Sequence, residues 1–325
     1  MAFRTALCDM LEIEVPVFLA GMGGVAFAPL CAAVSEAGGF GTLGMAAASP
    51  DAIRDEMRAV RELTSAPFGV DLLTALPQTL EQSAQVIIDE GAKAFIAGLG
   101  VPGPVIEKFH AAGVKVFSMC GTVRHAVAAA EAGCDAVVAQ GGEAGGHTGR
   151  VAGLALVPQI VDAVDVPVLA AGSIVDGRGV AAALALGAQG VWIGTRFIAT
   201  PEARAGAEYK DAIVRAGSSD TLITRCYSGK PMRVMKNDYV ESWRTREDEI
   251  ALFPQQAAFS FEAGVMNFML DSYSEMDTAS SCMPAGQGCG GIDEILPAAE
   301  VVRRLVGDAQ AALEQAAHAF TPRCD

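Results

Sequence analysis

The stretch AQGGEAGGHTGR, residues 139–150, places His147 among five glycines. Glycines on both sides make a regular helix or strand improbable, so a loop is predicted in which the backbone approaches a ligand closely. An imidazole, with an ordinary pKa of about 6.5, can accept or donate a proton at neutral pH. His147 is therefore the candidate catalytic residue. Glu143 either orients the imidazole or is a solvated carboxylate.

Two further glycine-rich segments, LAAGSIVDGRG and WIGTRF, follow apolar runs that read as neighbouring strands. Free backbone N–H groups converge at such strand ends and can bind an anion. The sequence therefore predicts that Gly172, Ser173, Gly194 and Thr195 hold a phosphate. Any one of these glycines could instead serve only to make a tight turn, but two clusters at matching strand ends favour the phosphate site.

A fold must bring these residues together. Eight short apolar runs alternate with alanine-rich helical stretches along the chain. Strands that are apolar throughout are typical of a parallel sheet covered on both faces by helices. An α/β fold is predicted, a closed (β/α)8 TIM barrel. An open doubly wound sheet is the alternative, less favoured because no GxGxxG follows the first run and because glycine or a polar residue ends nearly every run. The runs are 17–21, 40–44, 68–73, 94–98, 114–119, 135–141, 166–172 and 190–194.

The regular alternation stops after residue 204. Residues 205–295 have a mixed pattern with no strand of the earlier kind, and an amphipathic helix returns over 296–320. The prediction is a barrel formed by 1–204 and 296–325. A helical insertion over 205–295, between the eighth strand and the last helix, is predicted to cover the barrel mouth.

Composition excludes several classes of protein. With 38 acidic and 23 basic residues the net charge is −15, which repels nucleic acid and anionic membranes. Mean hydropathy is +0.34, yet polar residues or glycine interrupt every apolar run before about 18 residues, and Asp9 and Glu12 interrupt any signal peptide. A cytoplasmic protein is expected. The eight cysteines form no CxxC pair and no metal site is predicted. Cys282 and Cys289 are either ordinary thiols in a loop or a pair whose thiol groups have a functional role.

Five motifs together resemble the nitronate monooxygenase family, formerly called 2-nitropropane dioxygenases. The resemblance covers about residues 15–310, and flavin-dependent enoyl-thioester reductases and NADH:quinone reductases share much of it. It implies a TIM barrel with a helical insertion that binds FMN, in agreement with the predicted phosphate site. The motifs are GMGGVA, AQGGEAGGHTGR, AAGSIVDGRGVAAALALGAQGVWIGTRF, MKNDYVESW and MPAGQGCGGIDE.

The resemblance also implies roles for single residues, with His147 matching the catalytic histidine. One departure is Asp71, where the family usually has asparagine. An amide can donate a hydrogen bond to flavin acceptors and an ionised carboxylate only accepts, so Asp71 is expected to alter the flavin potential or the substrate class. The implied FMN-binding residues are Gly21, Met22, Gly23, Asp71, Gln140, Gly145, Gly146, Gly172, Ser173, Trp192, Ile193, Gly194 and Thr195.

The implied reaction is the oxidation of alkyl nitronates, such as propionate 3-nitronate, by O2 to a carbonyl compound and nitrite. His147 would abstract the α-proton of a neutral nitroalkane or hold the nitro oxygens of the anion, with Arg196 and Lys236 as candidate sources of positive potential. The alternative is an NAD(P)H-dependent reductase of an enoyl thioester (acyl-CoA or acyl carrier protein) or a quinone, with NAD(P)H as a further partner. A non-catalytic FMN-binding protein is less favoured, because it needs no protonatable group beside the cofactor. Monomer and homodimer both stay open.

Overall fold

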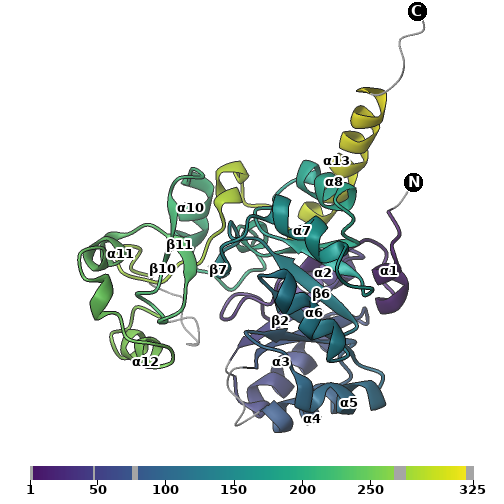
Figure 1. The fold of residues 1–325 in the computed structure, drawn as a ribbon, viewed down its shortest axis with the longest axis horizontal. Coiled ribbons are helices and arrows are strands. Elements are labelled where there is room, and N and C mark those ends of the chain that lie inside the picture. The colour runs from purple at the N-terminus through teal and green to yellow at the C-terminus, as the bar shows by residue number, and fades with distance from the viewer. Residues whose placement is uncertain (1–2, 47, 75–79, 267–275, 320–325) are drawn as a thin grey trace, which may run out of the picture.

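The computed structural model describes residues 3–46, 48–74, 80–266 and 276–319. All eight predicted strands are present, and they form one parallel sheet at the centre of the larger part of the molecule (Figure 1). Its order is β1-β9-β8-β6-β5-β4-β3-β2. The strands are β1 (Val17–Leu19), β2 (Gly41–Ala46), β3 (Phe68–Leu73), β4 (Ala94–Gly98), β5 (Lys115–Cys120), β6 (Ala136–Gln140), β8 (Val168–Ala171) and β9 (Gly190–Ile193).

The two ends of this sheet meet at β1 and β2. Phe18 and Phe40 form a parallel bridge. The Leu19 N–H donates to the Phe40 carbonyl and the Phe40 N–H to the Val17 carbonyl, both at 2.9 Å. The sheet is thereby a nearly closed barrel, as the TIM-barrel prediction requires, and the open-sheet alternative is wrong.

Helices connect the strands and lie outside the barrel, so that each strand is covered on its outer face. Several begin at a side-chain cap. The Ser49 hydroxyl accepts the Ala52 N–H at 3.2 Å, with Pro50 in the first turn. The helices are α1 (Ala6–Leu11), α2 (Ala28–Glu36), α3 (Pro50–Leu63), α4 (Leu80–Asp89), α5 (Gly103–Ala111), α6 (Val123–Glu131), α7 (Gly153–Val161), α8 (Gly177–Ala185), α9 (Thr195–Ile198) and α13 (Ala298–Ala319).

The interior of the barrel is packed with side chains. Phe18 contacts Phe40 and Phe117, with ring centroids 5.4 and 6.4 Å apart. Leu7 and Leu11 of α1 belong to the same buried cluster and close the end of the barrel that lies opposite the strands' C-terminal ends. A filled interior leaves a ligand only the C-terminal ends of the strands.

The described part of residues 205–295 contains several short helices and also two strands that the sequence did not predict. β10 (Thr221–Thr224) pairs with β11 (Met232–Met235), and β11 pairs with β7 (Gly146–His147), all antiparallel. The helical elements are α10 (Ala207–Arg215), α11 (Asp238–Trp243), α12 (Gln255–Glu262), and the 3-10 helices η2 (Glu247–Glu249) and η3 (Gln287–Gly291). In Figure 1, α11 and α12 lie to one side of the barrel and the small sheet lies between them and the barrel. The insertion boundaries at 205 and 295 stay predictions.

Among the described residues, no helix combines the length and apolar character needed to cross a membrane.

Candidate functional site

A cavity of about 700 Å³ lies at the C-terminal ends of the barrel strands. The insertion contributes to its wall through Tyr209, Lys230, Met232, Met266 and Pro284. The residues predicted as catalytic or FMN-binding all line this one cavity, although their individual roles stay predictions. They are Gly21, Met22, Gly23, Asp71, Gln140, Gly145, Gly146, His147, Gly172, Ser173, Trp192, Ile193, Gly194 and Thr195.

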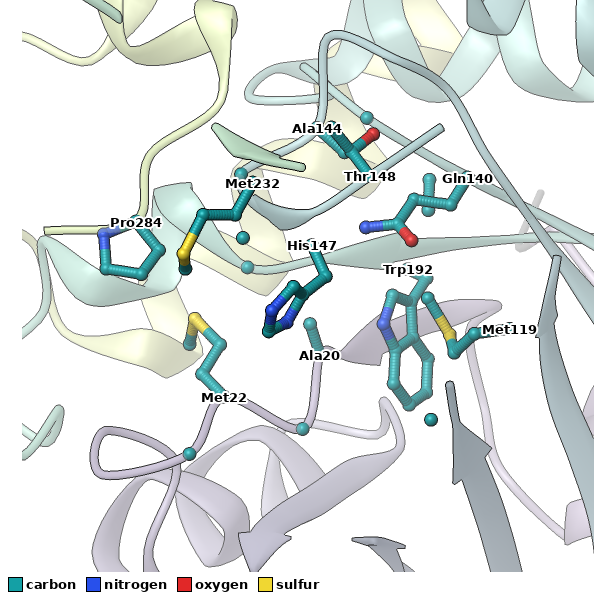
Figure 2. Close-up of a pocket in the computed structure, with 18 of the residues that line it drawn as sticks. Ala20, Met22, Met119, Gln140, Ala144, His147, Thr148, Trp192, Met232 and Pro284 are labelled. Atoms are coloured by element: carbon teal, nitrogen blue, oxygen red, sulfur yellow. The ribbon is translucent and has the colours of Figure 1, made fainter. Parts of the chain in front are cut away.

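His147 lies near the centre of this cavity in Figure 2, with Met22, Met232 and Pro284 on one side and Trp192 on the other. It belongs to the two-residue strand β7 rather than to an irregular loop, because it pairs with Met232 of the insertion. Burial lowers the pKa of His147 to about 4, and the positive charge of Lys230 adds to this effect. The imidazole is therefore neutral at neutral pH.

The insertion supplies a hydrogen-bond partner for this imidazole. His147 Nε2 lies 2.8 Å from the Ser228 hydroxyl, which is 1% exposed. The Lys230 N–H donates to the same hydroxyl at 3.3 Å and fixes its position. Ser228 precedes β11, so the strand that pairs with His147 also carries the turn that holds its side chain.

Arg233 joins the start of the histidine loop, residues 141–147, to the insertion. Its guanidinium donates two hydrogen bonds to the Gly142 carbonyl, at 3.2 and 3.0 Å, and one to the Thr221 hydroxyl at 3.2 Å. The side chain is buried, and burial lowers its pKa while the nearby Glu143 carboxylate raises it. The loop is thus held by both Arg233 and Ser228.

Glu143 has neither of the two roles considered from the sequence. Its carboxylate accepts the Gly153 N–H at the start of α7, at 3.0 and 3.1 Å. A Cβ at Gly141 or at Gly153 would overlap the same carboxylate. Glu143 therefore joins α7 to the histidine loop, and glycine at positions 141 and 153 leaves room for its carboxylate. In the described part of the chain, Glu143 forms no hydrogen bond with His147.

The predicted phosphate site has an unusual backbone. Gly172 and Ser173 have φ angles of +121° and +53°, a region that favours glycine, and such angles are concentrated at ligand sites. The Ser173 and Thr195 hydroxyls accept the N–H groups of Gly288 and Gly286, at 2.9 and 3.0 Å. Within residues that the structure describes, the N–H groups of Gly172, Ser173 and Thr195 donate no hydrogen bond. Unpaired N–H groups in a cavity wall suit an anion such as a phosphate.

The predicted sources of positive potential are wrong. The Arg196 guanidinium is buried away from the cavity and donates to the carbonyls of Ala199 and Glu294, at 2.9 and 2.8 Å. Lys236 is exposed and does not line the cavity. The lysine that does so is Lys230, whose Nζ lies 4.6 Å from the centroid of the Phe253 ring. Sequence reasoning missed Lys230 and Ser228, because the segment SGKP has the composition of an ordinary turn.

Two histidines and two cysteines lie at different distances from the cavity. His125 lines the cavity at the start of α6, whereas His110 pairs with Asp135 at 2.8 Å. Cys282 lines the cavity and Cys289 does not. Both are free thiols whose pKa burial raises, so both are protonated.

No cluster that could hold a metal ion occurs among the described residues.

A parallel eight-stranded barrel, a cavity at the C-terminal ends of its strands and a half-buried imidazole within it define an enzyme of the TIM-barrel class. Residues 4–86 and 78–308 match the family model for nitronate monooxygenase. The chain therefore belongs to the nitronate monooxygenase family, a family of flavin-dependent oxidoreductases.

Individual relatives agree with this assignment. A probable nitronate monooxygenase of Staphylococcus aureus (strain JH9) is 36% identical over 298 residues, covering 78% of this chain and 84% of the relative. FabK from Thermotoga maritima is 35% identical with a TM-score of 0.90, covering 98% of this chain and 99% of that one. A nitroalkane oxidase from Streptomyces ansochromogenes is 30% identical with a TM-score of 0.84, covering 96% and 99%. The resemblance found in the sequence motifs is confirmed.

Proposed function

We propose that the protein binds FMN and oxidises alkyl nitronates, such as propionate 3-nitronate, with O2 to a carbonyl compound and nitrite. The observation that carries this proposal is that His147 and Lys230 line one cavity, in which burial and the charge of Lys230 lower the pKa of the imidazole. An imidazole with a pKa of about 4 is a weak acceptor for the α-proton of a neutral nitroalkane. A nitronate arrives already deprotonated and needs only a hydrogen-bond donor and positive charge. Of the two roles considered for His147, holding the nitro oxygens is the supported one.

The residues around the cavity fit FMN. The unpaired N–H groups of Gly172, Ser173 and Thr195 would hold its phosphate. The flavin supplies electron-transfer chemistry when bound, and the protein supplies placement and local charge. The remaining predicted ligands would contact the ring and the rest of the cofactor: Gly21, Met22, Gly23, Asp71, Gln140, Gly145, Gly146, Trp192, Ile193 and Gly194.

The side chains of this chain have three tasks in the proposed reaction. Ser228 holds His147 at Nε2, so that the imidazole keeps one orientation. Met22, Met232 and Pro284 form an apolar wall beside it, which keeps water from the substrate (Figure 2). Lys230 contributes positive charge, which strengthens the binding of an anion in a desolvated site.

The test compares propionate 3-nitronate with its nitroalkane conjugate acid in an oxygen electrode, at one pH and before the two forms equilibrate. We expect rapid oxygen uptake and nitrite formation with the nitronate and little with the nitroalkane, because the imidazole is a weak base. Equal rates with both forms would show that a group in the cavity removes the α-proton. No turnover of either form would refute the proposed function.

A second candidate is an NAD(P)H-dependent reductase of an enoyl thioester or a quinone. The similarity to FabK favours it, and so does the extent of the cavity, which continues past the proposed flavin ligands to Leu99, Val101, Thr122 and His125. A small nitronate does not need that space. Anaerobic stopped-flow mixing with NADH or NADPH separates the two functions, because rapid bleaching of the flavin would favour the reductase.

Replacing Ser228 with alanine tests the positioning of the imidazole. Loss of one neutral hydrogen bond costs about 0.5–1.5 kcal/mol, so kcat for the nitronate should fall roughly three- to tenfold. KM should change less, because the cavity and Lys230 remain. Ser228→Thr keeps a hydroxyl and should recover part of kcat. Equal kcat values for the alanine variant and the unmodified enzyme would remove Ser228 from the mechanism.

A further inference from the structure

Asp71 occupies an unusual position for a carboxyl group. It lies in β3 between Gly44 of β2 and Ile96 of β4, and its side chain lines the cavity. A Cβ at Gly21 would overlap the Asp71 side chain, and a Cβ at Gly98 would lie 3.3 Å from its Oδ1. The carboxyl group is therefore packed between two stretches of glycine backbone, and its remaining open side is the cavity.

No charge compensates this carboxyl group. Among the described residues, neither of its oxygens forms a hydrogen bond or an ion pair, and the neighbours at positions 21, 44, 96 and 98 are all uncharged. Burial raises the pKa of Asp71 well above its ordinary value, and desolvation is the cause. None of the other titratable groups that line the cavity contributes to this pKa: His125, His147, Tyr209, Lys230 and Cys282.

We propose that Asp71 is a neutral carboxylic acid at neutral pH and that its O–H donates a hydrogen bond to the ring of FMN in this cavity. This inference rests on the FMN binding of the proposed function. A protonated carboxyl has one donor, whereas an ionised one only accepts. From the sequence, Asp71 is expected to lack the hydrogen-bond donor that an asparagine has. That difference holds only if the carboxyl group is ionised. The flavin ring offers carbonyl oxygens and ring nitrogens as acceptors.

Infrared spectroscopy tests the protonation state directly. At pH 7 the spectrum of the FMN-loaded enzyme minus that of Asp71→Asn should contain the carbonyl stretch of a protonated carboxylic acid. Removing FMN from the unmodified protein should shift this band, because the hydrogen bond to the ring is lost. A missing band would show that Asp71 is ionised, and a band that FMN does not shift would show that the carboxyl does not contact the ring. Either result overturns the inference.

Three variants supply a second measurement. Asp71→Asn keeps an N–H donor and should bind FMN within about threefold of the unmodified protein, as followed by flavin fluorescence. Asp71→Leu has a similar shape without a donor and should bind FMN roughly three- to tenfold more weakly. Asp51→Asn, in an exposed turn of α3, is the control for a change of charge alone. Equal affinities for the asparagine and leucine variants would contradict the hydrogen bond.

The pH dependence of stability follows from the same protonation state. The unfolded chain ionises Asp71 above its ordinary pKa while the folded protein keeps it neutral, so this residue's contribution to stability falls as pH rises. The free energy of unfolding of FMN-free Asp71→Asn should exceed that of the unmodified protein at pH 8, and the difference should shrink near pH 4. A protein that fails to bind FMN would refute the proposed function, whereas the carbonyl band of the free protein would still report on Asp71.

Discussion

Replacing His147 with alanine is expected to lower kcat/KM for propionate 3-nitronate by about a hundred- to a thousandfold, the usual cost of removing a hydrogen-bond donor that faces developing charge. The imidazole lies in the cavity, neutral and held by Ser228. The variant should retain FMN, because the proposed phosphate ligands are backbone N–H groups. Oxygen uptake and the flavin absorption spectrum measure the two properties independently.

His147→Gln and His110→Ala are the matched variants for this prediction. Glutamine keeps an N–H donor and should recover part of the activity, as a donor role requires. His110 pairs with Asp135 outside the cavity, so its replacement should leave turnover unchanged. Unchanged turnover in His147→Ala, with FMN retained, would exclude His147 from the reaction.

Stability against acid gives a second measurement on the same variants. The folded pKa of His147 is about 4, below the ordinary value of 6.5, so the unfolded chain takes up a proton first as pH falls. This residue's contribution to stability is therefore present above pH 6.5 and is lost as pH falls through about 4, and it is on the order of 3 kcal/mol. His147→Gln should lose less stability than the unmodified protein between pH 7 and pH 4.5. Urea titrations at the two pH values measure the difference.

The barrel could be predicted from the sequence because its strands are buried on both faces and appear as continuous apolar runs. Parallel strands bring their C-terminal ends to one side, so glycines distant in sequence, such as Gly172 and Gly194, could be assigned to one cavity. Whether a particular side chain faces the cavity or is buried away from it could not be predicted in the same way. Arg196 follows a strand end directly, yet its side chain turns away from the cavity toward the Glu294 carbonyl. Local sequence does not reveal that direction.

The contribution of the insertion could not be predicted, because it depends on contacts between distant parts of the chain. Ser228 meets His147 across 81 positions, through a strand of four residues that pairs with a strand of two. Such short strands have no periodicity that separates them from loops. Asp71 is a different case. The sequence identified the residue as a departure from the family, but its protonation depends on depth and on the absence of a partner, which only the fold determines.

Replacing Gly44 with alanine is expected to disrupt the cavity through the backbone of Met22, which lines it. Gly44 lies in β2 at a register shift, and its N–H donates to the Ala26 carbonyl at 2.8 Å. A Cβ at Gly44 would overlap the backbone of Met22, so the segment 21–26 must move. Overpacking of this kind costs about 1–3 kcal/mol, and displaced ring contacts should weaken FMN binding at least about tenfold. Thermal unfolding and flavin fluorescence measure the two effects.

Gly307→Ala is the matched control for this last variant. Gly307 lies in α13 and a Cβ there meets nothing within 4 Å. Alanine removes the backbone entropy cost of glycine in a helix, so this variant should gain about 0.5–1 kcal/mol of stability and keep its affinity for FMN. The opposite signs of the two glycine replacements follow from the space around each Cα. Unchanged stability of the Gly44→Ala protein would show that residues 21–26 can move without loss of free energy of unfolding. Unchanged FMN content would show that these residues do not shape the flavin site.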